Sequence, residues 1–181
     1  ALASLAGFTG NELQLIRFAG YLHDLGKLAV PAAILEKPGR LTPAEWDVVR
    51  AHTFYGYRTL EKIPHFEMIN MWGSLHHERL DGQGYPFHLR GEELPLGSRI
   101  MAVADVFTAL TENRPYRAGL PPAKALAIII GMAGDGALDG NIVDLLRSNL
   151  PAVDDYRRTM AGQAFEHYRQ FLAVPESKIS G

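Results

Sequence analysis

The sequence predicts an all-α fold, a compact bundle of helices. Three observations predict it: apolar residues recur at helical spacing, two segments open with capping signals, and no useful stretch alternates apolar and polar residues with the period of a strand. With 181 residues and a hydrophobic fraction of 47%, the chain is long enough to form one domain with a sizeable core.

The first two long helices are expected to begin at capping boxes. Thr9 and Thr42 each precede a glutamate by three residues, Glu12 and Glu45, and an apolar pattern of helical period follows each box. Further helices are expected over 66–77, 98–112, 123–132, 141–148 and 153–172. The segment 80–97 is rich in glycine and proline and is longer than a packing connection needs, which is typical of functional loops.

Composition excludes several classes of protein. The net charge of −2 creates no overall field that would attract DNA. Without cysteine there is no disulfide or thiolate metal site, which suits a reducing cytoplasm. The longest strongly apolar stretch, 125–130, is too short to span a bilayer. Because the chain opens at Ala1 with neither methionine nor a basic segment, we expect a piece of a longer protein and no signal peptide.

Histidines and aspartates recur at intervals of about one helix plus one loop. The six residues are His23, Asp24, His52, His76, His77 and Asp105. Each alone has an ordinary explanation, such as a hydrogen-bonded histidine at a helix end or a solvated aspartate. Together they have the residue types of a site with two metal ions, ligated mainly by imidazole and bridged by a carboxylate.

Asp105 is the most informative member of this set. It lies inside the apolar run 100–107, where a buried carboxylate without a partner would be costly, and a metal ion is the simplest partner. The alternative is an exposed aspartate on the polar side of that helix.

The ordered motifs of the chain resemble the HD-GYP domain, the bacterial branch of the HD superfamily of metal-dependent phosphohydrolases. The matching motifs are His23-Asp24-Leu25-Gly26-Lys27, His52, His76-His77-Glu78-Arg79, Asp81-Gly82-Gln83-Gly84-Tyr85-Pro86, Val103-Ala104-Asp105-Val106 and Arg114-Pro115-Tyr116-Arg117. The similarity covers about residues 8–150, and the ordered series with its Gly-Tyr-Pro signature is specific.

The resemblance implies a helical bundle of the HD-domain type and a phosphodiesterase that hydrolyses cyclic di-GMP to linear pGpG and in some members on to GMP. It implies an HD-GYP catalytic domain over 1–150, with a helical extension and tail over 151–181. The metal ligands it implies are His23, Asp24, His52, His76, His77 and Asp105, holding two divalent ions, usually iron or manganese. A third ion, or zinc, nickel or magnesium, is an alternative.

The resemblance also implies a set of substrate contacts. Asp24 matches the carboxylate that bridges the two metals, and Lys27 matches a lysine beside them that contacts a phosphate oxygen. Tyr85, Arg114 and Arg117 match positions that hold the cyclic dinucleotide, although surface charge explains one of the arginines equally well. From the residues themselves, Gly82 and Gly84 allow positive φ and leave backbone N–H groups free to meet an anion.

The ring of Tyr85 has three possible roles: stacking on a base, bonding a phosphate, or fixing its loop to the core.

Three hypotheses follow. The first is the cyclic di-GMP phosphodiesterase; the second is a sensor or protein-interaction module without turnover; the third is an HD phosphohydrolase of other nucleotides. The second is motivated by a departure: the family has a further metal-binding histidine upstream, and the 22 residues before His23 contain none. Signalling proteins such as GGDEF domains, and a second copy of the chain, are the expected protein partners.

Overall fold

The fold is all-α, as the sequence predicts. A computed structural model describes residues 1–113 and 118–172, and in these residues it contains helices, no strand, and an isolated β-bridge between Asp81 and Arg90. The elements, in chain order, are α1 (Leu2–Leu5), α2 (Gly10–Leu22), the 3-10 helix η1 (Leu25–Ala29), α3 (Ala32–Leu35), α4 (Pro43–Leu60), α5 (Glu67–Ser74), the 3-10 helix η2 (Gly91–Glu93), α6 (Leu96–Thr111), α7 (Pro122–Gly134), α8 (Gly140–Ser148) and α9 (Leu150–Leu172).

The expected capping box at Thr42 forms in full, and the one at Thr9 forms through the glutamate bond alone. The Glu12 carboxylate accepts the backbone N–H of Thr9 at 3.2 Å, and the Glu45 carboxylate accepts that of Thr42 at 2.7 Å. These bonds satisfy backbone donors that the first turn of a helix leaves without partners, so α2 and α4 begin where the sequence predicts.

The helix expected over 66–77 is shorter than predicted. It ends at Ser74, so His76 and His77 lie in the turn that follows. Gly73 and Ser74 have a lower helix propensity than alanine or leucine, which agrees with an end at this point. The two 3-10 helices, α1 and α3 were not expected, because they are too short to show a period.

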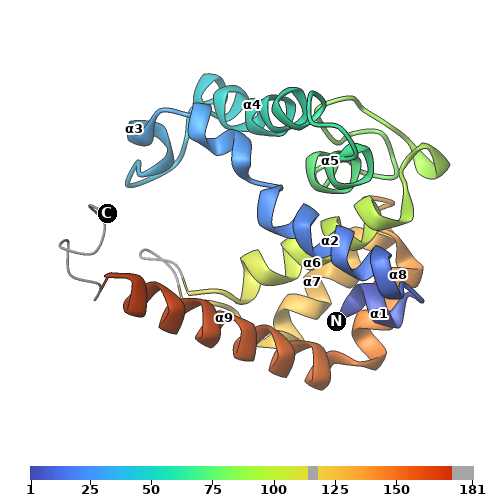
Figure 1. The fold of residues 1–181 in the computed structure, drawn as a ribbon. Helices are drawn as coiled ribbons and strands as arrows, with labels where there is room; N and C mark the ends of the chain where they lie inside the picture. Colours follow the sequence, from blue (N-terminus) through green and yellow to red (C-terminus); the bar gives the residue numbers. More distant parts are fainter. Residues whose placement is uncertain (114–117, 173–181) are drawn as a thin grey trace.

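Helix α6 lies at the centre of the bundle (Figure 1), where it contacts α1, α2, α5, α7 and α8. Its residues Ile100, Val103 and Phe107 are buried, as their helical spacing predicts. Burial of these side chains fixes the orientation of α6, and therefore the direction in which Asp105 leaves it.

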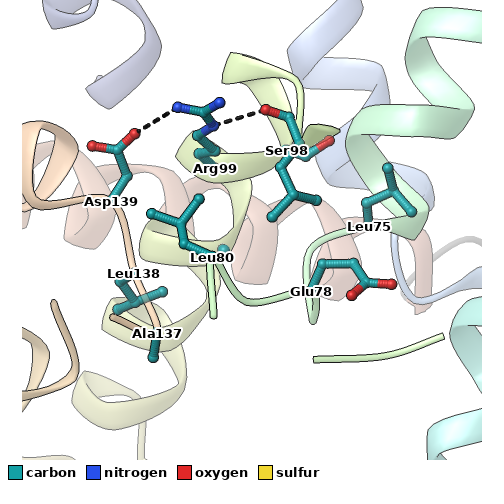
Figure 2. Close-up of a pocket in the computed structure, with 10 residues that line it drawn as sticks. Leu75, Glu78, Leu80, Ser98, Arg99, Ala137, Leu138 and Asp139 are labelled. Atoms are coloured by element: carbon teal, nitrogen blue, oxygen red, sulfur yellow. Dashed lines mark hydrogen bonds and ion pairs between the residues drawn. The ribbon is translucent and has the colours of Figure 1, made fainter. Parts of the chain in front are cut away.

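A small cavity beside the start of α6 is a packing gap. Its volume is about 10 Å³, roughly the space of one water molecule. Figure 2 shows Arg99 reaching across this region to Asp139, with a 3.2 Å ion pair between the guanidinium and the carboxylate. Asp139 also accepts the N–H of Asn141 at the start of α8, so the pair joins α6 to α8.

Helix α9 follows α8 and runs along one side of the molecule (Figure 1). It begins at Leu150, and a division of the chain at residue 150 stays a prediction. Among the described helices, none combines the length and apolar character needed to cross a membrane.

A close backbone contact at Gly26 joins η1 to α4. A Cβ at this position would lie 1.8 Å from the carbonyl oxygen of His52 and 2.7 Å from the backbone nitrogen of Gly56. No side chain can occupy that space, so only glycine lets the segment after α2 approach α4 this closely. The contact brings Asp24 and His52 together.

We predict that Gly26→Ala lowers the free energy of unfolding by about 3 kcal/mol or more, because the added methyl meets backbone atoms that cannot yield without separating η1 from α4. Chemical denaturation of the metal-free protein measures the change. Gly131→Ala is the matched control: this glycine lies in α7, an added Cβ there has nothing within 4 Å, and alanine favours the helix by about 1 kcal/mol. A Gly26→Ala variant as stable as the parent would contradict the packing described.

Candidate metal centre

Three histidines from different elements are held in the same way. His23 lies at the end of α2, His52 in α4, and His76 in the turn after α5. The Nδ1 of each ring bonds the backbone carbonyl three residues earlier, that of Gly20 (2.7 Å), Val49 (2.6 Å) and Gly73 respectively. A carbonyl only accepts, so Nδ1 carries the proton and Nε2 is left as the ligand atom.

These Nε2 atoms surround the carboxylate of Asp24. Oδ2 of Asp24 lies 3.4 Å from Nε2 of His23, and Oδ1 lies 3.4 Å from Nε2 of His52. Oδ1 of Asp105 lies 3.8 Å from the same His23 nitrogen. Because its two oxygens face different imidazoles, Asp24 has the arrangement of a carboxylate that bridges two cations.

The ligand atoms form two overlapping groups. One group is His52, His76 and His77, the other is His23, Asp24 and His76, and within each the ligand atoms lie within 4.8 Å of one another. These groups contain five of the six residues predicted from the sequence, and Asp105 lies beside them through its 3.8 Å approach to His23. Asp105 is half-buried rather than enclosed, since 26% of its side chain is exposed.

The residues present fit a metal centre. Within the described chain, three buried side-chain atoms have no hydrogen-bond partner: Oδ1 of Asp24, Nε2 of His52 and Nε2 of His76. Buried polar atoms without partners are rare and costly in native proteins. All three belong to the cluster and all three are electron-pair donors, so a divalent cation would satisfy them together.

Burial keeps the imidazoles neutral. It lowers the pKa of His76 to about 3 and that of His77 to about 2, with repulsion from neighbouring imidazoles adding to the effect. Burial also lowers the pKa of His52. Burial, the largest single influence, would raise the pKa of Asp24, but the hydrogen bond from Lys27 and the attraction of His23, Lys27 and His76 together outweigh it, so the pKa is lowered. His52, His76 and His77 are thus held neutral and Asp24 charged, the forms that bind metal.

Lys27 lies beside the centre. Its Nζ donates to Oδ2 of Asp24 at 2.6 Å, and 40% of its side chain is exposed. This places a positive charge next to the carboxylate that would bridge the metals, within reach of an anionic ligand.

Glu78 organises the loop that follows the two histidines. It is buried, and its carboxylate accepts the backbone N–H groups of Phe87, His88 and Leu89 at 2.6, 3.0 and 3.2 Å. Sequence reasoning gave this residue no role. The available signal was a carboxylate directly after two metal-ligand histidines, which marks a residue that needs a partner of its own.

The glycines of the loop act differently from the prediction. Gly82 has φ of 77°, as expected, but its N–H donates to the carbonyl of Arg79 and is not free for an anion. Gly84 does not adopt positive φ; it is required because a Cβ would lie 2.3 Å from the backbone nitrogen of Arg79. These glycines allow the loop to fold tightly against Glu78 and Arg79, and the prediction of free N–H groups was wrong for Gly82.

Tyr85 packs beside His77, one of the predicted metal ligands. Its ring centroid lies 4.9 Å from that of His77, and the Arg50 guanidinium lies 5.7 Å from the Tyr85 ring centre. Burial raises the pKa of Tyr85 to about 12, so the phenol stays protonated. Of the three expected roles, the geometry favours fixing the loop and the His77 ring; a contact with substrate stays a prediction.

A large cleft reaches the centre from one side. Its volume is about 1330 Å³, and its walls come from α2, α6, α9 and residues around 119–122. Among the predicted site residues, His23 and Asp105 line it, whereas Lys27, Gly84 and Tyr85 do not. Arg114 and Arg117 lie outside the described residues, but Asn113 and Gly119 on either side of them line the cleft.

The lowered pKa values predict acid sensitivity of the metal-free protein. In the unfolded chain a histidine binds a proton near pH 6.5, whereas in the folded protein His76 binds one only near pH 3 and His77 only near pH 2. The free energy of unfolding is therefore highest above pH 6.5 and falls as the pH drops below that value. The free energy of unfolding should fall by about 1.4 kcal/mol per pH unit for each such histidine.

Chemical denaturation of the protein in the presence of a chelator, at several pH values between 7.5 and 5, measures this slope. The window lies above the pH range in which most carboxylates titrate, so the histidines dominate the change. His77→Gln should reduce the slope, with His167→Gln on exposed α9 as the matched control. A stability that does not change over this range would mean that the imidazoles are not buried.

We also predict that Mn²⁺ at about 100 times its dissociation constant stabilises the protein by about 2.7 kcal/mol, seen as a rise in Tm. Asp24→Asn should abolish most of this rise, because the amide loses the charge and one of the two oxygens that face the imidazoles. Asp47→Asn, at an exposed position on α4, is the control. An equal rise in Asp24→Asn and the parent would remove Asp24 from the centre.

Comparisons with known proteins identify the family of the chain. The HD domain family model matches residues 1–142. The chain is 49% identical over 114 residues, 63% of its length, to a 3′3′-cGAMP-specific phosphodiesterase 3 of Vibrio cholerae, and 42% identical over 147 residues, 80% of its length, to a cyclic di-GMP phosphodiesterase response regulator of Xanthomonas campestris. It is 38% identical over 159 residues, 87% of its length, to a cyclic di-GMP phosphodiesterase of Thermotoga maritima.

The chain spans only part of these relatives, namely 25%, 39% and 43% of their respective lengths. The family model nevertheless covers all six predicted metal ligands and the Gly-Tyr-Pro loop. The chain therefore belongs to the HD domain family of metal-dependent hydrolases, and its motifs are those of the HD-GYP type.

Proposed function

We propose that the chain hydrolyses the phosphodiester of a cyclic dinucleotide, with cyclic di-GMP as the first candidate substrate and linear pGpG as the first product. The observation that carries the proposal is the pair of ligand groups that share His76, with Asp24 between their imidazoles, beside a cleft of about 1330 Å³. A drug-sized or larger ligand fits a cleft of that volume.

Two divalent ions, when bound, supply Lewis acidity at the phosphate and an acidified water. The chain's own residues prepare the place for them. The carbonyls of Gly20, Val49 and Gly73 fix the orientation of three imidazoles, and Asp24 supplies negative charge between them. Because the imidazole pKa values are lowered, the ligands need not lose protons at neutral pH.

Lys27 is proposed to hold a phosphate oxygen. Its Nζ lies 2.6 Å from Asp24 and is partly exposed, so it can turn from that carboxylate toward an arriving anion. As a compact ammonium it would act as a point charge, neutralising the phosphate as its charge increases in the transition state. It is not proposed as a general acid.

The remaining substrate contacts are proposals of differing support. Arg114 and Arg117 are supported by Asn113 and Gly119, which line the cleft on either side of them. A guanidinium fork suits both phosphate oxygens and the acceptor edge of guanine. Gly84 and Tyr85 have less support, because they belong to the loop beside His77 and do not line this cleft.

The second candidate substrate is 3′3′-cGAMP. It is named for relatives from Vibrio cholerae that are 49% and 37% identical to the chain. Both candidates place the same phosphodiester at the centre and differ in one purine, so the metal cluster does not discriminate between them.

The identity of the metal and the biological setting are also proposals. Imidazole and carboxylate ligands without thiolate suit iron or manganese, the ions that we propose. A cytoplasmic location, signalling partners of the GGDEF type and a homodimer stay predictions.

Hydrolysis assays with added Mn²⁺ or Fe²⁺ test the function. We expect turnover of cyclic di-GMP or 3′3′-cGAMP, with chromatography of products distinguishing linear pGpG from GMP. Lys27→Met should lower kcat/KM by about 100-fold without changing metal content, since it removes one charge from the transition state. Lys62→Met, at an exposed position, is the matched control.

Two outcomes would overturn the proposal. Tight binding of a cyclic dinucleotide without hydrolysis, in protein shown to hold two metal ions, would indicate a sensor. Faster turnover of mononucleotides than of cyclic dinucleotides would indicate an HD phosphohydrolase with a different substrate.

A further inference from the structure

Three helices each present one stripe of side chains to the large cleft. From α2 the stripe contains Arg17, Gly20 and Tyr21, and from α6 it contains Asp105 and Thr108. The stripe from α9 is Tyr156, Met160, Gln163 and His167, spaced at four, three and four residues along the helix. This helical spacing means that one continuous face of α9 forms a wall of the cleft.

Two tyrosines in these walls are exposed. Tyr21 of α2 is 73% exposed and Tyr156 of α9 is 48% exposed, and both line the cleft. Tyr21 lies two residues before His23 in the sequence, and both residues line the cleft. Neither ring is used in the core, whereas the ring of Tyr85 is engaged by His77 and Arg50.

The charges around these rings suit an anion. Among the described residues, three arginines, Arg17, Arg157 and Arg158, line the cleft, against one glutamate, Glu112, and the aspartate Asp105 of the predicted metal centre. Asp154, which is buried, pairs with both Arg157 and Arg158 at 2.7 Å, so one carboxylate holds two guanidinium groups and leaves a positive charge on this wall. Proteins commonly bind nucleotides by stacking the bases on exposed aromatic rings and pairing the phosphates with cations. Such binding does not depend on hydrogen bonds to the edges of the bases.

We propose that Tyr21 and Tyr156 are the platforms on which the two bases of the cyclic dinucleotide stack when its phosphodiester lies at His23 and Asp105. This inference rests on the proposed function and deepens it by assigning base contacts to two residues outside the family motifs. Every purine has a π-face, so the same platforms accept guanine and adenine. The tyrosines therefore contribute affinity for both candidate substrates and little discrimination between them.

Steady-state kinetics of Tyr21→Ala and Tyr156→Ala test the inference, with cyclic di-GMP and 3′3′-cGAMP as substrates and Mn²⁺ as the metal. Each substitution should raise KM by roughly tenfold, the effect typical of one lost base stack, and kcat should change much less. Tyr21→Phe and Tyr156→Phe should restore the parent KM, because the ring is kept. Metal content and the Mn²⁺-dependent rise in Tm should be the same in all variants.

Two substitutions on the same helices are matched controls. Phe18→Ala removes a ring from α2 that is 51% exposed, and Tyr168→Ala removes one from α9 that is 59% exposed; neither ring lines the cleft. Both should keep the parent KM. A raised KM in these controls, or an unchanged KM in Tyr21→Ala and Tyr156→Ala, would overturn the stacking.

Failure of the function is separable from failure of the inference. If the parent protein hydrolyses neither cyclic dinucleotide, the proposed function fails, and the equilibrium dissociation constant of cyclic di-GMP then tests the stacking. A roughly tenfold weaker binding in both alanine variants, restored by phenylalanine, supports it. Equal binding in all variants, or no binding by the parent, overturns it.

Discussion

The site depends on a set of buried polar atoms that protein groups do not satisfy. Nε2 of His52, Nε2 of His76 and Oδ1 of Asp24 are buried without hydrogen-bond partners among the described residues. A buried electron-pair donor without a partner raises the free energy of the folded state, and here three such atoms lie in one cluster. A protein that builds such a cluster gains stability from whatever cation fills it, so binding of metal and stability of the fold are linked.

The fold provides the cluster by joining element ends. His23 and Asp24 form the junction between α2 and η1, and His76 and His77 follow α5, so two of the chain's turns meet at one point. The contact at Gly26 brings η1 onto α4, and the buried side of α6 directs Asp105 toward His23. Backbone carbonyls three residues before His23, His52 and His76 then orient the imidazoles, a role that does not depend on the side chain of the residue that supplies the carbonyl.

Much of this could be predicted from the sequence, and the rest could not for identifiable reasons. The helices and the six ligands carry local signals: capping boxes, helical period, and residue types that bind metal. The end of α5 at Ser74 was missed because the apolar period indicates that a helix is present but does not fix the residue at which its last turn ends. The close approach of Gly84 to Arg79 and the bonds from Glu78 to the following loop depend on tertiary contacts, which local sequence patterns do not contain. Tyr21 and Tyr156 are far apart in the chain, and only the folded cleft brings them into one site.

The central claim is that the six residues form one centre for two ions. Elemental analysis of protein loaded with Mn²⁺ and then passed through a desalting column tests it most directly. The two overlapping ligand groups predict two ions per chain at saturation. A saturated content of one ion per chain, or none, would contradict the claim, because it would mean that the two groups do not act together as a binuclear centre.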